Sequence, residues 1–422
     1  MENFKIDNKI LNLAADVENS LKETFKQIEL TYEINENRVL KSFLDCKVST
    51  SHFYENAGYG YDDIGKNKLD ELFSKIFVSE DAFVRSGFVS GTHAIAVALF
   101  AVLSPQDVLL SVSGTPYPTI RKTIGIVKNK DKNSLMDFGI KYEEINIFKK
   151  DEVDIELLEK KIQKNVKVIY IQRSKGYSVR HSITINQIKK VADFVHSIDK
   201  EIVVFVDNCY GEFVEEKEPT KVGANLMAGS LIKNPGGGVA KTGGYIAGKK
   251  SLINLCAQRF AAPGLGKEIG SNLNENKDLF FGIFIAPFFV SNALKSSAFT
   301  RAIFEKLKFN VFPKAFEKTS DIVCVLQLNS KEKLESFCEG IQNNSPINSF
   351  FKPTAAKMPG YSKKIIMASG GFVPGASLEL SADAEVAPPY NVFLQGGLTY
   401  VSAKTAILRT IQKMKNENLI IF

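Results

Sequence analysis

The sequence has few cysteines, no long apolar run and no signal-peptide pattern. Its five cysteines are odd in number and form no CxxC pair, which argues against a disulfide framework and a structural zinc site. We expect most of them to be reduced core residues. The longest apolar stretch, Leu279 to Val290, is interrupted by Gly282 and Pro287 and is shorter than the roughly 20 residues of a membrane span. The opening residues, MENFKIDNKI, lack an apolar core, so we expect a cytoplasmic protein without a membrane span.

Charge is nearly balanced, with 54 basic and 47 acidic residues and a net charge of +7. These charges are spread along the chain without a polybasic run, so nucleic acid is not an expected partner. The 422 residues are 44% hydrophobic and 24% charged, which is enough to build a sizeable core in two or three domains. We predict no metal site.

The order of segments predicts an α/β protein. Polar, helix-forming sequence from Asn8 to Lys41 leads to a glycine- and tyrosine-rich loop, Asn56 to Gly65. From Gly91 onward, apolar helical segments alternate with short β-branched runs, which is typical of a mostly parallel sheet. The expected domains are an N-terminal helical segment (1–55), a large α/β domain (56–294) and a smaller C-terminal α+β domain (295–422). The expected strands are Val108 to Val112, Val166 to Gln172, Ile202 to Val206, Leu226 to Ile232 and Gly244 to Ala247, with crossover helices at Ile155 to Gln163 and Ile185 to Ile198.

Ser90, Gly91 and Thr92 stand directly before the helical run His93 to Leu103. Unpaired amides and the positive end of the helix dipole make such a glycine-containing start a natural phosphate cradle. An ordinary Ser/Thr helix cap is the alternative interpretation.

Two further residues follow predicted strands. Asp207 ends the strand Ile202 to Val206, where ligands of open α/β sheets bind, although an acid there also suits a turn cap. Lys233 follows a second apolar strand, and Ser230 precedes it by three positions. Partial desolvation would lower the pKa of this lysine and make its amine a nucleophile toward an aldehyde. An aspartate, a lysine and a phosphate-binding helix start together match the requirements of pyridoxal phosphate.

Seven segments also resemble a known family. They are GYGYDDIG (58–65), SGTHAI (90–95), SGTPY (113–117), VDNCYGE (206–212), SLIKNPGGG (230–238), TGGYIAG (242–248) and QGGLTY (395–400). Together they resemble the methionine gamma-lyase-like family, often labelled cystathionine beta-lyases involved in aluminium resistance. The resemblance implies a pyridoxal-phosphate enzyme with the fold type I, aspartate aminotransferase-like architecture, and it covers nearly the whole chain.

The resemblance also implies residue roles. Lys233 would hold the cofactor aldehyde as an imine, and Asp207 would pair with the ring nitrogen. Tyr117 would stack on the ring, and Tyr59 and Tyr61 would reach the phosphate of a neighbouring subunit's cofactor, which implies a homodimer or homotetramer with shared active sites. The phosphate would lie among Ser90, Gly91, Thr92 and Ser230.

Two departures from the family pattern concern positive charge. Lys66 stands where relatives carry an arginine, so charge is kept but the bidentate fork is lost. The segment Leu380 to Tyr390 contains no arginine before its Pro-Tyr pair, where one that clamps the substrate carboxylate is expected. Arg173 and Arg180 are the candidate replacements, with surface arginines as the alternative.

The implied activity is a carbon-sulfur lyase acting by β- or γ-elimination on an amino acid such as cystathionine, cysteine or methionine. Lys233 would act as base at Cα, and Lys233 or Tyr117 at Cβ in the γ route. A cofactor-binding protein of the same fold with another amino-acid substrate or little catalysis is the alternative.

Two rival assignments follow from neighbouring motifs. Lys241 competes with Lys233 as the cofactor lysine, although it lies inside a glycine-rich turn. The segment Gly243 to Lys249 approaches a nucleotide-binding P-loop, but Lys250 replaces the hydroxyl residue required for magnesium.

Overall fold

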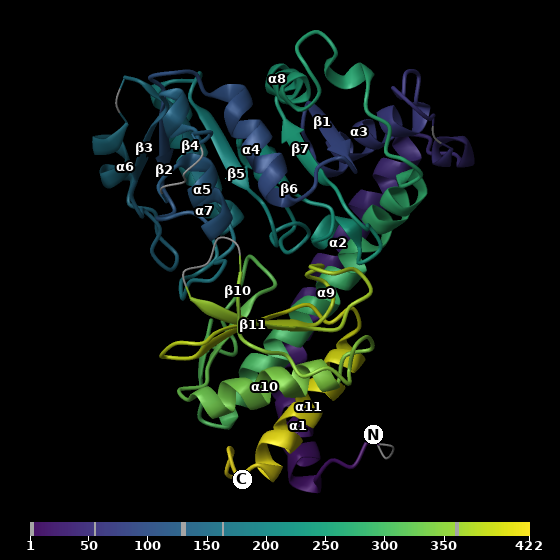
Figure 1. Cartoon of the computed structure of the whole chain (residues 1–422), viewed down its shortest axis with the longest axis vertical. Coiled ribbons are helices and arrows are strands. Elements are labelled where there is room, and N and C mark those ends of the chain that lie inside the picture. The colour runs from purple at the N-terminus through teal and green to yellow at the C-terminus, as the bar shows by residue number, and fades with distance from the viewer. Residues whose placement is uncertain (1–3, 55, 128–131, 163, 359–362) are drawn as a thin grey trace.

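The chain folds around two separate sheets that are bridged by long helices (Figure 1). The computed structural model describes residues 4–54, 56–127, 132–162, 164–358 and 363–422. The large sheet lies toward one end of the molecule and the small sheet toward the other, where both ends of the chain also lie (Figure 1). This arrangement confirms the α/β, fold type I prediction of a large domain with a mostly parallel sheet and a smaller α+β part.

The large sheet has seven strands in the order β1-β7-β6-β5-β4-β2-β3. The neighbours from β6 to β3 are parallel, whereas β7 runs antiparallel to both β6 and β1. Runs such as VKVIYIQ in β4 are apolar on both faces because helices cover both sides of the sheet. The strands are β1 Asp81–Arg85, β2 Val108–Ser111, β3 Lys141–Glu144, β4 Val166–Gln172, β5 Val203–Asp207, β6 Leu226–Ser230 and β7 Gly244–Gly248.

Two apolar cores sandwich this sheet. Helices α4, α5 and α8 pack on one face, and α3, α6, α7 and the first part of α9 pack on the other. Helix α7 shows how its sequence defines it, because Thr184 and Gln187 form a capping box and the buried positions recur with helical spacing. These helices are α3 Ile64–Phe77, α4 Gly91–Val102, α5 Pro118–Ile124, α6 Ile155–Lys161, α7 Ile185–Ile198 and α8 Lys250–Phe260, with short 3-10 turns at Thr50–Phe53, Met136–Phe138, Pro219–Val222, Asn234–Gly236 and Gly266–Glu268.

The small sheet has six antiparallel strands in the order β10-β11-β12-β13-β9-β8. Its core is shared with α1, α10, α11 and the second part of α9. The elements are α1 Asn8–Ser20, β8 Asn310–Phe312, β9 Cys324–Gln327, α10 Lys331–Asn343, β10 Ala356–Lys357, β11 Lys364–Ser369, β12 Ser381–Glu385, β13 Asn391–Gln395 and α11 Tyr400–Asn416.

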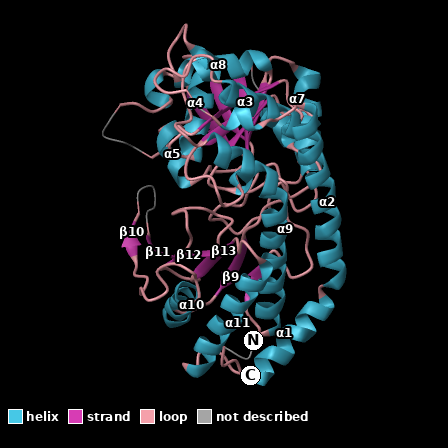
Figure 2. Ribbon diagram, turned by 90° about the vertical axis from the view of Figure 1, so that its right-hand side faces the viewer, coloured by secondary structure: helices cyan, strands magenta, loops and turns pink. Residues whose placement is uncertain are grey.

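Helices α9 (Asn276–Lys306) and α2 (Lys22–Asp45) run side by side between the two sheets (Figure 2). Helix α9 continues through Gly282 and Pro287, the two residues that interrupt its apolar stretch. Packing along the helix offsets the hydrogen bond that Pro287 cannot donate. By length and composition α9 could cross a membrane, but 67% of its most apolar window is buried inside the fold, as in a core helix.

Helix α9 contributes to both cores. Its residues up to Leu294 pack under the large sheet, and those from Ala298 pack under the small one. The predicted division at residues 294 and 295 therefore falls inside a continuous helix, at the point where its packing partners change. All five cysteines are buried and unpaired, as expected.

Candidate active site

The carboxyl ends of three parallel strands gather polar residues at one edge of the large sheet. Gln172 pairs in register with Asp207 across β4 and β5, and β6 ends beside them at Ser230. The Asp207 carboxylate is buried and accepts hydrogen bonds from Tyr170 Oη (3.2 Å) and the Cys209 amide (3.1 Å). Burial raises the pKa of Asp207, and the charge of Lys233 opposes this rise. Asp207 is therefore an interior acid within the field of that lysine.

Lys233 lies three residues beyond the end of β6, before the turn Asn234–Gly236. Its Nζ lies over the ring of Tyr210, 3.9 Å from the centroid. Within the described ranges, no carboxylate oxygen lies within 4.0 Å of this nitrogen. The amine is thus held over an aromatic ring by a half-buried side chain, without a direct ion pair in the described chain.

The predicted lowering of the Lys233 pKa is wrong for the free amine. Burial does lower this pKa, but Cys209, Tyr210, Asp207 and Glu212 outweigh burial and raise it. The prediction rested on desolvation alone, whereas the fold surrounds the ammonium with groups that become negative when ionised.

The start of α4 lies against the end of β6. Ser90 caps the helix by accepting a hydrogen bond from the His93 amide at 3.1 Å. A Cβ added at Gly91 would lie 3.0 Å from Ser230 Cβ and 3.2 Å from Cys209 Sγ, so glycine allows this approach without displacing either side chain. Amides in the first turn have no carbonyl partner within a helix, which makes this end suitable for an anion.

Tyr117 is positioned by the end of β4. Its amide donates to Gln172 Oε1 at 2.6 Å, and its ring stacks on Tyr177 with centroids 5.6 Å apart and planes at 29°. Tyr177 Oη donates in turn to Asp383 Oδ2 at 2.7 Å. This chain of contacts connects the large sheet with β12 of the small sheet.

A second interior acid, Glu212, lies beside Lys233. Tyr245 Oη donates to Glu212 Oε1 at 2.7 Å, and Oε2 has no hydrogen-bond partner among the described residues. Burial raises the Glu212 pKa to about 8, so the acid is mostly protonated at neutral pH. The Glu212 carbonyl also accepts from Asn234 Nδ2 at 2.9 Å, which ties it to the turn after Lys233.

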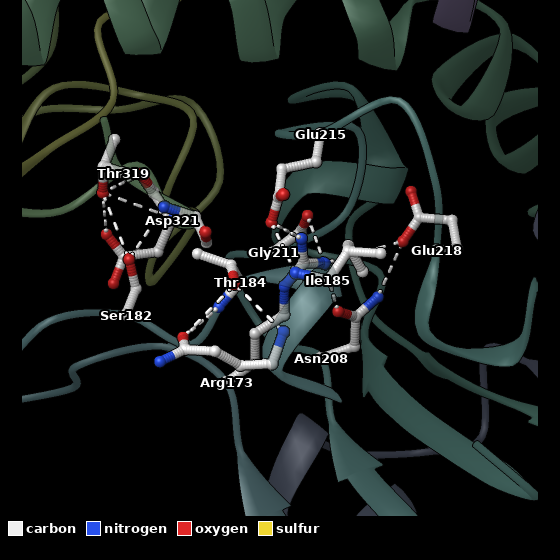
Figure 3. Close-up of polar contacts among 12 residues, drawn as sticks. Arg173, Ser182, Thr184, Ile185, Asn208, Gly211, Glu215, Glu218, Thr319 and Asp321 are labelled. Atoms are coloured by element: carbon white, nitrogen blue, oxygen red, sulfur yellow. Dashed lines mark hydrogen bonds and ion pairs between the residues drawn. The ribbon is translucent and has the colours of Figure 1, made fainter. Parts of the chain in front are cut away.

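The two candidate carboxylate-binding arginines differ in their surroundings. Arg173 is completely buried, and Figure 3 shows its guanidinium enclosed by residues of the 208–218 segment. It donates to Asn208 Oδ1 and the Gly211 carbonyl, both at 2.8 Å, and pairs with Glu215 at 2.9 Å and Glu218 at 3.8 Å. These contacts occupy the guanidinium, so the structure does not favour Arg173 as a substrate ligand.

Arg180 is held by backbone carbonyls beside the end of β4. Its Nη2 donates to the Gln172 carbonyl at 2.8 Å and the Ser174 carbonyl at 2.5 Å. Burial lowers its pKa to about 10, and the charges of Asp321 and Asp207 oppose that fall. Its electrostatic coupling to Asp207 places Arg180 within the field of the site.

The tyrosine-rich loop lies apart from the contacts described for Lys233. The rings of Tyr59 and Tyr61 pack on each other with centroids 5.6 Å apart and are 71% and 52% exposed. Lys66 anchors this loop, because its buried Nζ donates to the carbonyls of Gly60, Lys267 and Glu268 at 2.9 to 3.1 Å. Lys66 also lines a polar cavity of about 680 Å³, whose lining includes none of the residues predicted to bind the cofactor.

The two rival assignments, Lys241 as the cofactor lysine and a nucleotide-binding P-loop, are not favoured by the structure. Lys241 has an exposed side chain that pairs with Glu275 and Asp278. The segment that approaches a P-loop forms strand β7 instead of a loop. In the ranges that the structure describes, no group of three or more potential metal ligands converges.

Three residues of this region were missed by the sequence analysis: Gln172, Tyr177 and Asp383. Gln172 was visible as the polar end of an apolar strand. Tyr177 and Asp383 gave little signal because they meet only when the two sheets are brought together.

Comparison with known proteins agrees with this fold. A profile of the methionine gamma-lyase family matches residues 10–415. An uncharacterised protein of Bacillus subtilis, YnbB, is 46% identical over 96% of this chain and 97% of its own length. A carbon-sulfur lyase involved in aluminium resistance from Clostridium novyi has a solved structure that is 42% identical, with a TM-score of 0.93 over 98% of this chain and 97% of that one. A Bacillus cereus protein of solved structure is 46% identical, with a TM-score of 0.93, covering 96% and 99%.

More distant structures share the fold. The pyridoxal-5′-phosphate-dependent protein YhfS from Escherichia coli is 12% identical with a TM-score of 0.62, covering 92% of this chain and 97% of that one. Because the family match spans nearly the whole chain, the predicted resemblance and cofactor are confirmed. The chain belongs to the methionine gamma-lyase family of pyridoxal 5′-phosphate-dependent carbon-sulfur lyases.

Proposed function

We propose that this protein is a cytoplasmic lyase that cleaves a carbon-sulfur bond in an amino acid such as cystathionine, cysteine or methionine. The observation that carries the proposal is the placement of Lys233. Its half-buried side chain places the amine over Tyr210, without a direct ion pair within the described residues, and the amine is coupled to Asp207. In its deprotonated form, an amine at this position can react with an aldehyde and accept a proton.

The residues around Lys233 fit pyridoxal phosphate. The close approach of Gly91 to Ser230 leaves the first-turn amides of α4 to face an anion, which suits the phosphate. Asp207 would hold the protonated ring nitrogen, and Tyr117 would stack on the ring. When bound, the cofactor withdraws electrons from the α-carbon of the substrate. Thr92, whose hydroxyl lies 2.7 Å from that of Thr119, would complete the phosphate-binding turn with Ser90.

Proton transfer would fall to Lys233. Its Nζ would take the proton from the substrate Cα, because the surrounding groups raise the Lys233 pKa and so stabilise the resulting ammonium. In a γ-elimination a second proton would leave Cβ, with Lys233 or Tyr117 as base. The contact of Tyr117 with Gln172 fixes the start of α5 near the strand ends for this role.

We assign the substrate carboxylate to Arg180 in preference to Arg173. The guanidinium of Arg173 is already engaged by two acids and two neutral oxygens. Arg180 is coupled electrostatically to Asp207 and is anchored through backbone carbonyls, and no carboxylate pairs with it among the described residues.

We further propose that the active unit is a homodimer or a homotetramer. Tyr59 and Tyr61 present exposed rings on a loop that is anchored by Lys66, so they are available to a second copy. In such an assembly they would reach the phosphate bound by the neighbouring subunit. If the mass measured in solution is that of a single chain, Tyr59 and Tyr61 cannot contribute to a shared active site.

Substitution of the lysine tests the assignment. Lys233→Ala is expected to abolish the visible absorbance of protein-bound cofactor and to lower keto-acid production from cystathionine, cysteine and methionine by at least about a thousandfold. Lys241→Ala is the matched control, because that exposed lysine pairs with Glu275 and Asp278 instead. Borohydride reduction followed by peptide mass spectrometry identifies the modified lysine independently of turnover.

The outcomes separate the candidate functions. Modification of Lys241, or full activity in Lys233→Ala, would refute the assignment of Lys233. Cofactor bound at Lys233 without keto acid from any of the three substrates would instead favour the alternative, a cofactor-binding protein with another amino-acid substrate or little catalysis. The lack of an arginine in Leu380 to Tyr390 is the observation behind that alternative.

A further inference from the structure

Asp383 is a buried acid of the small sheet that faces the strand-end site. It lies in β12, where Ala382 and Ala384 point into the small core and Asp383 points to the opposite side. Only 6% of the residue is exposed. Tyr177 Oη donates to Oδ2 at 2.7 Å and Gln395 Nε2 approaches the same oxygen at 3.5 Å, whereas no hydrogen bond within the described residues ends on Oδ1.

The ring of Tyr177, whose hydroxyl donates to this carboxylate, belongs to a cluster of aromatic rings. Tyr177 stacks on Tyr117 on one side and meets Phe393 edge-on, with centroids 5.0 Å apart and planes at 73°. The ring of Tyr210 belongs to the same apolar cluster as Tyr177 and Phe393 and lies under Lys233. A carboxylate among aromatic faces is a chemical setting that recognises cations.

The charge of Asp383 is not matched by a direct partner. Lys233 lowers the Asp383 pKa, so its ammonium lies within electrostatic range, but no ion pair to Asp383 forms within the described residues. Burial raises this pKa to about 6, so the carboxylate is ionised at slightly alkaline pH. Burying a carboxylate without a cationic partner costs free energy. A ligand that supplies the cation would recover part of that free energy on binding.

The segment around Asp383 also has little positive charge to balance the carboxylate. The segment Leu380 to Tyr390 lacks the arginine expected for a substrate carboxylate. Its two acids differ, because Glu385 pairs with Lys363 whereas Asp383 has no such partner in the described chain. This part of the small sheet therefore presents negative charge toward the site.

We propose that Asp383 and Tyr177 form a subsite for a cationic nitrogen on the substrate side chain. The preferred substrate would then be a sulfur amino acid whose leaving group carries an ammonium. This inference rests on the proposed lyase function and narrows its substrate class.

Two matched compounds test the subsite with the holoenzyme. S-(2-aminoethyl)cysteine and S-propylcysteine have side chains of the same length and differ by a terminal ammonium or methyl group. The wild-type protein is expected to favour the aminoethyl compound in kcat/KM by about tenfold or more, and Asp383→Asn is expected to reduce that preference to about one. Turnover of S-propylcysteine, which carries no cation on its side chain, measures any loss that the variant causes through Lys233 or through folding.

Glu385→Gln is the matched control, because it removes one carboxylate from the same strand at a residue that pairs with Lys363. It should retain the preference. An equal loss on both compounds in Asp383→Asn would overturn the subsite, because it would mean that Asp383 acts through Lys233 or through folding. The absence of any preference in the wild-type protein would overturn it as well.

Binding measurements separate this inference from the lyase proposal. Calorimetric titration of the holoenzyme with each compound reports discrimination even when neither is turned over. Tighter binding of the aminoethyl compound that is lost in Asp383→Asn would support the subsite although lyase activity had failed. Keto-acid formation without discrimination would support the lyase and overturn the subsite, and binding of neither compound would also overturn it.

Discussion

At the scale of single residues, Glu212 shows how the interior beside Lys233 controls protonation. Its ordinary pKa of 4.5 is raised to about 8 by burial, and the Tyr245 hydroxyl opposes this rise. The folded protein therefore keeps a proton that the unfolded chain releases, so this group costs stability progressively as pH rises from about 4.5 to about 8. A neutral isostere would remove that cost.

Glu212→Gln is accordingly expected to shift the free energy of unfolding in a pH-dependent way. Relative to wild type, the variant should gain about 4 kcal/mol between about pH 5 and about pH 9, because the amide keeps the oxygen that accepts from Tyr245 and has no proton to lose. Urea unfolding at both pH values measures the difference. The exposed neighbour Glu216 supplies the control, and a Glu216→Gln variant with the same gain would contradict the assignment to burial.

At the scale of elements, the position of Lys233 depends on how closely α9 approaches the turn after it. A Cβ added at Gly282 would lie 2.4 Å from the Gly236 carbonyl oxygen, and one at Gly237 would lie 2.4 Å from the Gly282 carbonyl oxygen. These contacts involve backbone on both sides, so neither partner can rotate away. The helix and the Asn234–Gly236 turn therefore position Lys233 together.

Gly282→Ala is expected to push α9 away from this turn. We expect a loss of about 1 to 3 kcal/mol in the free energy of unfolding and a weaker affinity for pyridoxal phosphate, measured by urea unfolding and cofactor titration. Lys277→Ala, at an exposed position of the same helix, should change stability by less than about 0.5 kcal/mol. Unchanged stability and cofactor affinity in Gly282→Ala would show that the turn does not need the close approach.

Elements with a strong apolar pattern were predicted well from sequence, whereas edge strands were not. The limits of β4 and α7 match the prediction at both ends because their buried positions repeat clearly. Strand β3, KYEE, was missed because an edge strand with partly exposed residues resembles a loop. The short β1, DAFVR, was missed because its pairing with β7 is antiparallel and depends on a segment far away in sequence.

Some residues of the candidate site could likewise be predicted from sequence, whereas others could not. Motifs identified Asp207, Ser230 and Lys233 because each follows a strand of one sheet, and the carboxyl ends of parallel strands meet at one edge. The contact between Tyr177 and Asp383 could not be predicted, because it depends on how a second sheet docks on the first. The occupation of Arg173 by Glu215 likewise depends on the path of the 208–218 segment and not on spacing along the chain.

At the scale of the whole molecule, one buried ion pair fastens the two sheet-based parts. Lys175, just beyond β4, pairs with Asp321, just before β9, and both side chains are fully buried. Lys175 Nζ also donates to the Val323 carbonyl at 2.8 Å. The carboxylate has further donors in the Lys175 amide (2.9 Å), the Val323 amide (3.3 Å) and the Thr319 hydroxyl (3.0 Å). Figure 3 shows Asp321 beside Thr319 and Ser182.

The Asp321 carboxylate has several other hydrogen-bond donors, whereas the Lys175 ammonium has one other acceptor. Removing one partner or the other should therefore lower the free energy of unfolding by different amounts. Asp321→Ala should lower the free energy of unfolding by about 3 to 5 kcal/mol, because it leaves the Lys175 ammonium buried with one carbonyl. Lys175→Met should cost about 1 to 2 kcal/mol less, since three donors still stabilise the carboxylate. Urea unfolding of the two variants compares these losses, with Lys189→Met as a control for an exposed pair on α7. Equal losses would contradict the account.

Helix α1 joins the small core through contacts with α9 and α11, and Asp7 and Glu18 meet Gln412, Lys415, Tyr400 and Lys404. During synthesis, α1 leaves the ribosome long before α11 and must wait for α11 before it can bury its apolar face. The nascent chain can complete the large sheet while its opening segment is still unprotected. Delivery of that segment to the finished small core is therefore a late, long-range event in folding.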